Sequence, residues 1–132
     1  MLELLIAVLI VSVGLLGIAS MQAIGLRNNH SAYMRSQATV LAYDIVDRMR
    51  ANYEAAVAAQ YDIAMGDDAP TCSGAVPACD LNSWLTRLRN VLPNGDGSVT
   101  VSNTGATTVI VQWTDDRENP TETLNFQFDT SL

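Results

Sequence analysis

The side chains best suited to covalent or metal chemistry in this sequence are two cysteines and one histidine. Cys72 and Cys79 are seven residues apart in the stretch PTCSGAVPAC. In an exported chain, two cysteines this close in a loop favour a disulfide that closes the loop, whereas in a chain that stays in the cytoplasm they would be two free thiols. A metal site would need further ligands, and the single histidine, His30, lies on a different segment. We therefore expect a Cys72–Cys79 disulfide and no metal or other cofactor.

Two further runs of polar residues are better explained as a turn and a loop than as binding sites. The run NGDG at positions 94–97 has a slight likeness to a calcium loop, but it lacks the alternating acids and the final bidentate glutamate, so we expect a hairpin-type turn. The run DDRE at positions 115–118 is typical of a solvated loop tip. The sequence contains no glycine-rich phosphate loop and no nucleophile elbow. We therefore expect a protein that is not an enzyme and that works through assembly or surface recognition.

The charge is distributed unevenly along the 132 residues. Residues 1–26 carry a net charge of −1, residues 27–50 carry +2 and residues 51–132 carry −8, which gives the total of −7. All seven basic residues are arginines. An acidic C-terminal part without a basic patch is unsuited to the phosphate backbone, so nucleic acid is not an expected partner.

The N-terminal segment has the composition of a membrane-spanning helix. Residues Leu4–Leu26 carry no charge, and a single acid, Glu3, stands just before them. About 20 apolar residues suffice to cross a bilayer as a helix. A secretory signal peptide would begin with basic residues, and this segment does not. We expect an apolar stalk over residues 1–26 and one small domain, the head, over residues 27–132.

The helix is expected to continue well beyond the apolar segment. No proline or glycine occurs between Leu26 and Ala59, and apolar residues recur at helical spacing at Met34, Ala38, Leu41, Ile45 and Met49. The spacings of Asp44 with Arg48 and of Asp47 with Arg50 favour ion pairs on the opposite surface of the helix. The pattern predicts one helix of roughly 55 to 60 residues, apolar all round in its first half and amphipathic in its second.

Three glycines lie in the apolar half. Gly14, Gly17 and Gly25 would each weaken a helix by about 1 kcal/mol relative to alanine. They either permit close packing against neighbouring helices or allow the helix to bend. The sequence leaves both explanations open.

The remainder of the chain predicts a loop, a short helix and a small sheet. Residues 66–79 read as a loop, Asp80 as the N-cap of a helix from Leu81 to about Val91, and residues 93–95 as its end. Three runs with alternating apolar residues predict strands at residues 98–102, 107–114 and 123–128. One face of this antiparallel meander would carry Val99, Val101, Val109, Val111, Trp113, Leu124, Phe126 and Phe128. The expected fold class is α+β, with the amphipathic half of the long helix packed on the sheet.

The sequence places an acid ahead of a wholly apolar helix, and this helix continues into an amphipathic segment on a small C-terminal sheet. This arrangement resembles the type IV pilin family. Within it, the segment RNNHSAYMRSQATVLAYDIVDRMRAN, residues 27–52, is similar to the PilV class of minor pilins, also called pilus modification proteins. The runs VGLLGIA, DLNSW and VQWT and the tail FQFDTSL are similar as well. The likeness covers nearly the whole chain. Its class-specific part implies a surface of the long helix made of Arg27, Asn28, Asn29, Tyr33, Arg35, Gln37, Asp44, Asp47, Arg48 and Arg50.

The resemblance implies a role for Glu3. In the family, a prepilin is cut after a glycine by a dedicated membrane peptidase, the new N-terminus is methylated, and the acid near it pairs with the terminal amine of a neighbouring subunit. Glu3 corresponds to that acid, although the leader, its glycine and the usual first two residues are not seen here, so we expect a trimmed start or a start codon assigned too late. A carboxylate at the edge of hydrocarbon is unfavourable unless it is paired, which agrees with this role, although it could also simply mark the membrane boundary.

The resemblance also implies partners and a location. These are other minor pilins, the major pilin, a tip adhesin, the inner-membrane assembly platform, the prepilin peptidase and membrane lipid. The head would lie in the periplasm of a Gram-negative bacterium and later in the pilus, where the protein primes assembly near the tip and supports adhesion and twitching motility. Arg27 and Arg35 beyond the stalk favour a cytoplasmic head by the positive-inside rule, but basic residues in a leader would oppose them, and the cysteine pair favours an oxidising compartment. A type II secretion pseudopilin and a membrane-tethered ligand-binding module are the alternatives.

Overall fold

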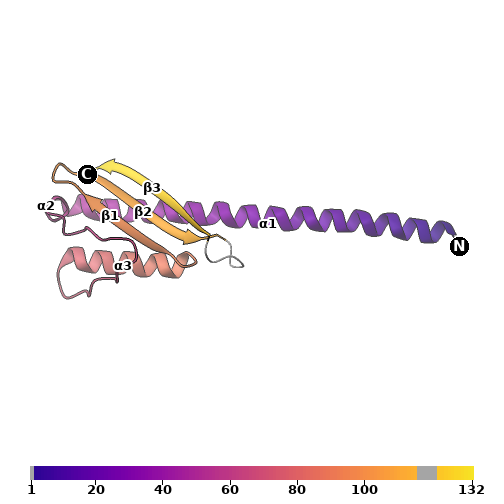
Figure 1. The fold of residues 1–132 in the computed structure, drawn as a ribbon, viewed down its shortest axis with the longest axis horizontal. Helices are drawn as coiled ribbons and strands as arrows, with labels where there is room; N and C mark the ends of the chain where they lie inside the picture. The colour runs from indigo at the N-terminus through magenta and orange to yellow at the C-terminus, as the bar shows by residue number, and fades with distance from the viewer. Residues whose placement is uncertain (1, 116–121) are drawn as a thin grey trace. The chain divides into compact units, whose positions relative to one another are not determined.

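The computed structural model describes residues 2–115 and 122–132, which form three helices and a three-stranded sheet (Figure 1). The elements are α1 (Leu2–Ala51), α2 (Tyr53–Val57), α3 (Val76–Val91), β1 (Asp96–Val101), β2 (Ala106–Thr114) and β3 (Thr123–Ser131). The expected α+β class, with a long N-terminal helix packed on a small antiparallel sheet and a short extra helix, is confirmed. The chain divides into two compact units between Tyr33 and Met34, whereas composition alone placed the boundary at Leu26.

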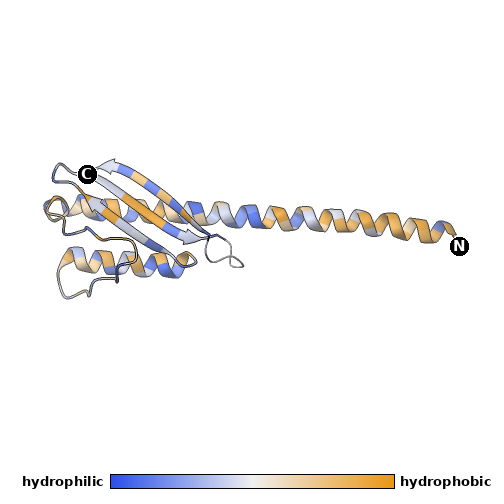
Figure 2. Ribbon diagram, viewed as in Figure 1, coloured by the Kyte–Doolittle hydropathy of each residue, from blue (hydrophilic) through white to orange (hydrophobic). Residues whose placement is uncertain are grey.

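The first half of α1 is exposed. Its side chains are exposed from Leu2 to Ile24, and its large apolar ones expose 51% to 76% of their surface. Figure 2 shows this half as hydrophobic along almost its whole length. Among the described residues α1 is long and apolar enough to cross a membrane, with a mean hydropathy of 2.7 in its most apolar window. A helix without a polar face has to be covered by lipid or by other helices.

The glycines of this half lie in regular helix. α1 continues through Gly14, Gly17 and Gly25, and a Cβ atom at any of them would meet nothing within 4 Å. Among the residues that the structure describes, therefore, none of the three glycines is needed for a close contact.

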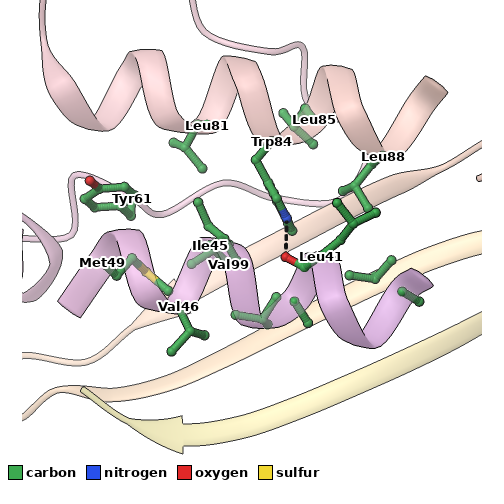
Figure 3. Packing of buried hydrophobic residues seen from close by; sticks show 14 of the residues in the cluster. Leu41, Ile45, Val46, Met49, Tyr61, Leu81, Trp84, Leu85, Leu88 and Val99 are labelled. Carbon is green, nitrogen blue, oxygen red and sulfur yellow. Dashed lines mark hydrogen bonds between the residues drawn. The ribbon is translucent and has the colours of Figure 1, made fainter. Parts of the chain in front are cut away.

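The second half of α1 buries the expected apolar stripe. Met34, Ala38, Leu41, Ile45 and Met49 are all buried, and Ala42 and Val46 widen the stripe. Figure 3 shows Leu41 and Ile45 facing side chains of α3 and β1, and Met49 next to Tyr61. The prediction of an amphipathic second half is confirmed.

The long helix ends earlier than the predicted 55 to 60 residues. α1 stops at Ala51, and Asn52 leaves the helical conformation with φ −129° and ψ 51° before the short helix α2. The Asn52 side chain is used outside the helix, since its Nδ2 donates to the Tyr61 hydroxyl at 3.4 Å. Ala59 then takes a φ of +59°, which no regular helix contains. The periodicity of the apolar residues does not reveal this change of backbone direction.

The extra helix begins earlier than predicted. α3 starts at Val76, with Pro77 near its N-terminus and Ala75 as the N-cap, and it includes Asp80 in its interior. The prediction of Asp80 as the N-cap is therefore wrong. Proline suits the first turn of a helix because its missing N–H has no partner there in any case. The expected buried stripe of Leu81, Trp84, Leu85 and Leu88 is confirmed.

The sheet is an antiparallel meander in the order β1-β2-β3. Val99 pairs with Val109, and Val111 with Phe126, so the apolar residues share one face as predicted. Val99, Val101, Val109, Val111 and Trp113 are buried on it, while Leu124, Phe126 and Phe128 of the outer strand are half-buried. All three strands are confirmed. β1 begins two residues before its predicted start and ends one residue before its predicted end, β2 begins one residue earlier, and β3 ends three residues later than predicted.

The turn before β1 links a helix to a strand. Residues 92–95 connect α3 to β1, so the predicted turn begins in this connection and runs into the first two residues of β1, but it does not close a hairpin. Asn94 has a φ of +51°, and a Cβ atom at Gly97 would lie 2.5 Å from Cη2 of Trp84. Glycine at position 97 therefore lets β1 approach α3 closely.

Candidate functional site

The first candidate site is the exposed apolar surface of α1 with Glu3 at its start. Glu3 lies in the first turn of α1 and is exposed, and the side chains around it, Leu2, Leu4 and Leu5, are at least 69% exposed. An acid in the first turn interacts favourably with the helix dipole. The geometry presents one carboxylate beside a continuous apolar surface, which is suited to contact with other helices or lipid.

The helix-surface residues implied by the resemblance do not form a single site. They divide by exposure. Arg27, Asn28, Asn29, Tyr33, Arg35, Asp47 and Arg50 are exposed, whereas Gln37, Asp44 and Arg48 are partly buried. His30 is exposed beside the first of these residues. The partly buried ion pair of Asp44 and Arg48 meets α3, and Arg50 donates to the Thr130 hydroxyl and to the Ser131 carbonyl oxygen of β3, both at 3.4 Å.

Arg48 is the centre of a polar network between α1 and α3. Its guanidinium donates to Asp44 at 3.2 Å and to Asp80 at 3.0 Å, and Asp44 also lies 3.5 Å from Arg87. Burial lowers the pKa of Arg48, but the hydrogen bonds and charges of Asp80 and Asp44 outweigh it and raise the pKa overall. The expected Asp44–Arg48 and Asp47–Arg50 pairs are both present, but the first faces α3 and is not on a purely solvated surface.

Tyr61, which follows α1 and α2 in the chain, extends this polar network. The hydroxyl group of the fully buried Tyr61 donates a hydrogen bond to Asp80 at 2.7 Å and accepts a hydrogen bond from Asn52. Burial and the hydrogen bond to Asp80 raise the pKa of Tyr61 to about 12. Asp80 thus links α1, the 52–61 segment and α3. In the sequence, the feature that points to a structural role for Asp80 is its position directly after Cys79.

The predicted disulfide is present. Cys72 and Cys79 are bonded, with their Cα atoms 4.3 Å apart. Cys79 lies in the first turns of α3, so the bridge ties the 66–75 loop to the start of this helix. Asn82 of α3 holds the same loop through a hydrogen bond from its Nδ2 to the Pro70 carbonyl oxygen at 2.8 Å. Because Asp80 follows Cys79 directly, the bridge also fixes the start of the polar network.

A buried hydrogen bond joins α3 to α1 in the core of the head. The indole N–H of Trp84 donates to the carbonyl oxygen of Leu41 at 2.9 Å, drawn as a dashed line in Figure 3. A buried tryptophan usually needs such a partner. This bond fixes α3 on the amphipathic half of α1.

The calcium-like run does not assemble a ligand cluster in the part of the chain that the structure describes. Asp96 accepts a hydrogen bond from the backbone N–H of Gly66 at 2.7 Å, so it holds the preceding loop. Across residues 2–115 and 122–132, no three acidic, histidine or cysteine side chains come close enough to hold a metal ion. In the 115–118 run, only Asp115 is among the described residues, and the other three lie outside them.

Comparison with known proteins gives no relative from which a function could be transferred. The chain matches no protein-family model, no curated protein and no solved structure.

Proposed function

We propose that this chain is a minor pilin of the type IV pilus, of the PilV class. It is held in the inner membrane by the apolar half of α1 and is then incorporated into the filament, where it helps to prime assembly near the tip and so supports adhesion and twitching motility. It acts by assembly and is not an enzyme. Its partners are other minor pilins, the major pilin, the assembly platform, a tip adhesin and, before processing, the prepilin peptidase.

The observation that carries the proposal is the change of environment along one unbroken helix. α1 runs from Leu2 to Ala51 without interruption, exposed in its first half and buried in the head from Met34 onward. An isolated membrane anchor does not need to continue as part of a folded core. A helix shared by an apolar stalk and a folded head suits a subunit that exchanges lipid for neighbouring stalks.

The disulfide supports a head outside the cytoplasm. The described residues include no free cysteine, and the Cys72–Cys79 bridge is typical of an oxidising compartment such as the periplasm. This agrees with a stalk in the inner membrane and a head on its outer side.

Deletion of the gene tests the proposal. We expect the deletion strain to make fewer or shorter pili, and we expect the protein to be found in pili sheared from wild-type cells. Normal pili with unchanged adhesion and twitching would contradict the proposal. Co-purification with a type II secretion machinery in place of sheared pili would instead identify a pseudopilin, and a protein found only in the inner membrane would fit a tethered binding module.

A further inference from the structure

The two outer strands of the sheet differ in how their free sides are covered. Beside β1, Ile63 and Val99 exchange two backbone hydrogen bonds of 3.0 Å, and the carboxylate of Asp62 accepts from the backbone N–H of Val101 at 2.9 Å. β3 is the other outer strand, because the strand order is β1-β2-β3. Among the described residues, one side of β3 has no neighbouring strand.

Alternate residues of β3 point their backbone groups away from β2. The backbone N–H of Leu132 donates to the carbonyl oxygen of Gly105, in the register of β2 with β3. Because this direction alternates along an antiparallel strand, the even-numbered residues of β3 bond to β2 and the odd-numbered ones point outward. Within residues 2–115 and 122–132, no hydrogen bond reaches the backbone groups of Asn125, Gln127 and Asp129. We call these three outward-pointing pairs of backbone groups the β3 edge.

β3 lacks the features that usually protect an outer strand. It is nine residues long, contains no proline, lysine or arginine, and pairs with β2 without a bulge from Thr123 to Ser131. Arg50 covers only its end, where it donates to the carbonyl oxygen of Ser131 at 3.4 Å. A long outer strand with free backbone groups is a template for a further strand.

The inner face of β3 is incompletely covered as well. Leu124, Phe126 and Phe128 are half-buried, whereas Val109, which pairs with Phe128, is buried. A hollow of about 400 Å³ lies between this face and α1. Tyr43 of α1, which is 46% exposed, packs against Phe128 with the ring centroids 4.6 Å apart. Apolar side chains of an added strand would be buried beside this row.

A second copy of this chain does not suit the β3 edge. α1 runs alongside β3 in the same direction, since Tyr43 contacts Phe128 and Arg50, further along α1, contacts Thr130. Antiparallel pairing of two β3 strands requires a two-fold axis, which reverses α1 in the second copy. Two chains anchored in one membrane would have to point the same way. The net charge of −8 on residues 51–132 of each copy opposes such pairing further.

The charge beside the β3 edge indicates what kind of strand fits. The exposed carboxylate of Asp129 accepts hydrogen bonds from Thr108 at 2.7 Å and from Gln127 at 2.9 Å. It forms no ion pair with a basic residue in the described part of the chain. A lysine or arginine opposite Asp129 on an added strand is therefore favoured over an acid.

We propose that the β3 edge binds an extended segment of a partner protein as a fourth strand of the sheet. The outward backbone groups of Asn125, Gln127 and Asp129 pair with the backbone of this segment. Its alternate apolar side chains cover Phe126 and Phe128, and a lysine or arginine between them lies opposite Asp129. The binding belongs to the head and does not rest on the proposed entry into a filament.

Backbone methylation tests whether the bound segment is a strand. The full chain, labelled with ¹⁵N in zwitterionic micelles, would be titrated with the capped peptide Thr-Val-Lys-Val-Lys-Val-Thr and with two forms of it, N-methylated at the lysines or at the valines. Every second N–H of a strand faces its neighbour, so one methylation pattern blocks pairing and the other permits it. We expect the backbone amide signals of Asn125, Gln127 and Asp129 to move, and their hydrogen exchange to slow, with the unmodified peptide and with one methylated form only.

A pair of variants at one position separates the backbone from the side chain. Proline at position 127 removes an outward N–H and is compatible with an outer strand. We expect Gln127→Pro to weaken binding of the unmodified peptide by about tenfold, whereas Gln127→Ala, which keeps the N–H, binds like the wild type. The indole signal of Trp84, whose N–H is bonded to Leu41, would verify that both variants keep the core. We expect a peptide with Glu in place of both lysines to bind about fivefold more weakly or worse.

The proposal is overturned if the two methylated peptides bind alike, if Gln127→Pro binds as tightly as Gln127→Ala, or if the Glu peptide matches the Lys peptide. It is also overturned if the unmodified peptide leaves the three amide signals unmoved at millimolar concentration. A chain that dimerises in micelles, with slow exchange at these three amides before any peptide is added, would assign the β3 edge to a second copy and would contradict the proposal as well.

Discussion

At the residue scale, Asp80 connects more elements of the head than any other polar side chain discussed above. It accepts from Arg48 of α1 and from the buried Tyr61, while its own backbone belongs to α3. Hydrogen bonds to charged groups contribute about 1.5 to 3 kcal/mol each when they are partly buried. The stability of the head should therefore depend strongly on this one carboxylate.

We predict that Asp80→Ala lowers the free energy of unfolding by about 2 kcal/mol, because the Tyr61 hydroxyl and part of the Arg48 guanidinium lose their acceptor. Denaturant unfolding of the full chain in micelles, followed by tryptophan fluorescence, measures this change. Asp47→Ala is the matched control, since the Asp47 side chain is 72% exposed and its loss should change stability by less than about 0.5 kcal/mol. Equal effects of the two variants would refute the structural role of Asp80.

Tyr61 makes the stability of the head depend on pH in the alkaline range. Its pKa is about 12 in the folded chain and about 10 when unfolded, so the unfolded state loses the proton first as the pH rises. The contribution of Tyr61 to the free energy of unfolding is complete below about pH 10 and falls by roughly 1.4 kcal/mol per pH unit until about pH 12. We predict that Tyr61→Phe removes this part of the decline, as measured by unfolding at a series of pH values. Curves for the wild type and the variant that stay parallel above about pH 10 would contradict the assignment.

At the element scale, the disulfide controls how the 66–75 loop meets α3. Cys79 lies three residues into this helix, and the polar network begins at the next residue. Closing a loop of this size stabilises a fold by about 2 to 3 kcal/mol in the chain-entropy model.

We predict that the double variant Cys72→Ser, Cys79→Ser lowers the free energy of unfolding by about 2 to 3 kcal/mol without affecting membrane association. Denaturant unfolding measures the first effect and membrane fractionation the second, because the bridge lies in the head and the stalk is separate from it. A single variant, Ser73→Ala, leaves the bridge intact and serves as the control. Unchanged stability of the double variant would show that the bridge does not support the head.

The elements differ in how well the sequence predicts them. The stripe from Met34 to Met49 and the alternating strands could be predicted because burial on one face imposes a period on the residues. The break at Asn52 and the start of α3 at Val76 could not. No proline or glycine marks the break at Asn52, and the proline that lies in the first turn of α3 is equally typical of a loop.

At the scale of the whole molecule, two units share one helix. The residues up to Tyr33 form the exposed helix, and those from Met34 contain the buried core. Among residues 2–115 and 122–132, the apolar surface in the first half of α1 and the carboxylate of Glu3 are exposed. The proposed filament would cover both, since neighbouring stalks bury the apolar surface and a terminal amine pairs with the acid.

The most direct test of this account is the amount of Glu3→Ala protein in sheared pili, relative to that in the inner membrane, in a strain that lacks the wild-type gene. Glu54→Ala is the matched control, because Glu54 is an exposed acid in α2 of the head. The account predicts that Glu3→Ala protein stays in the membrane and is strongly depleted from pili, while Glu54→Ala protein enters them normally. Incorporation of the Glu3→Ala variant at the level of the wild type would contradict it.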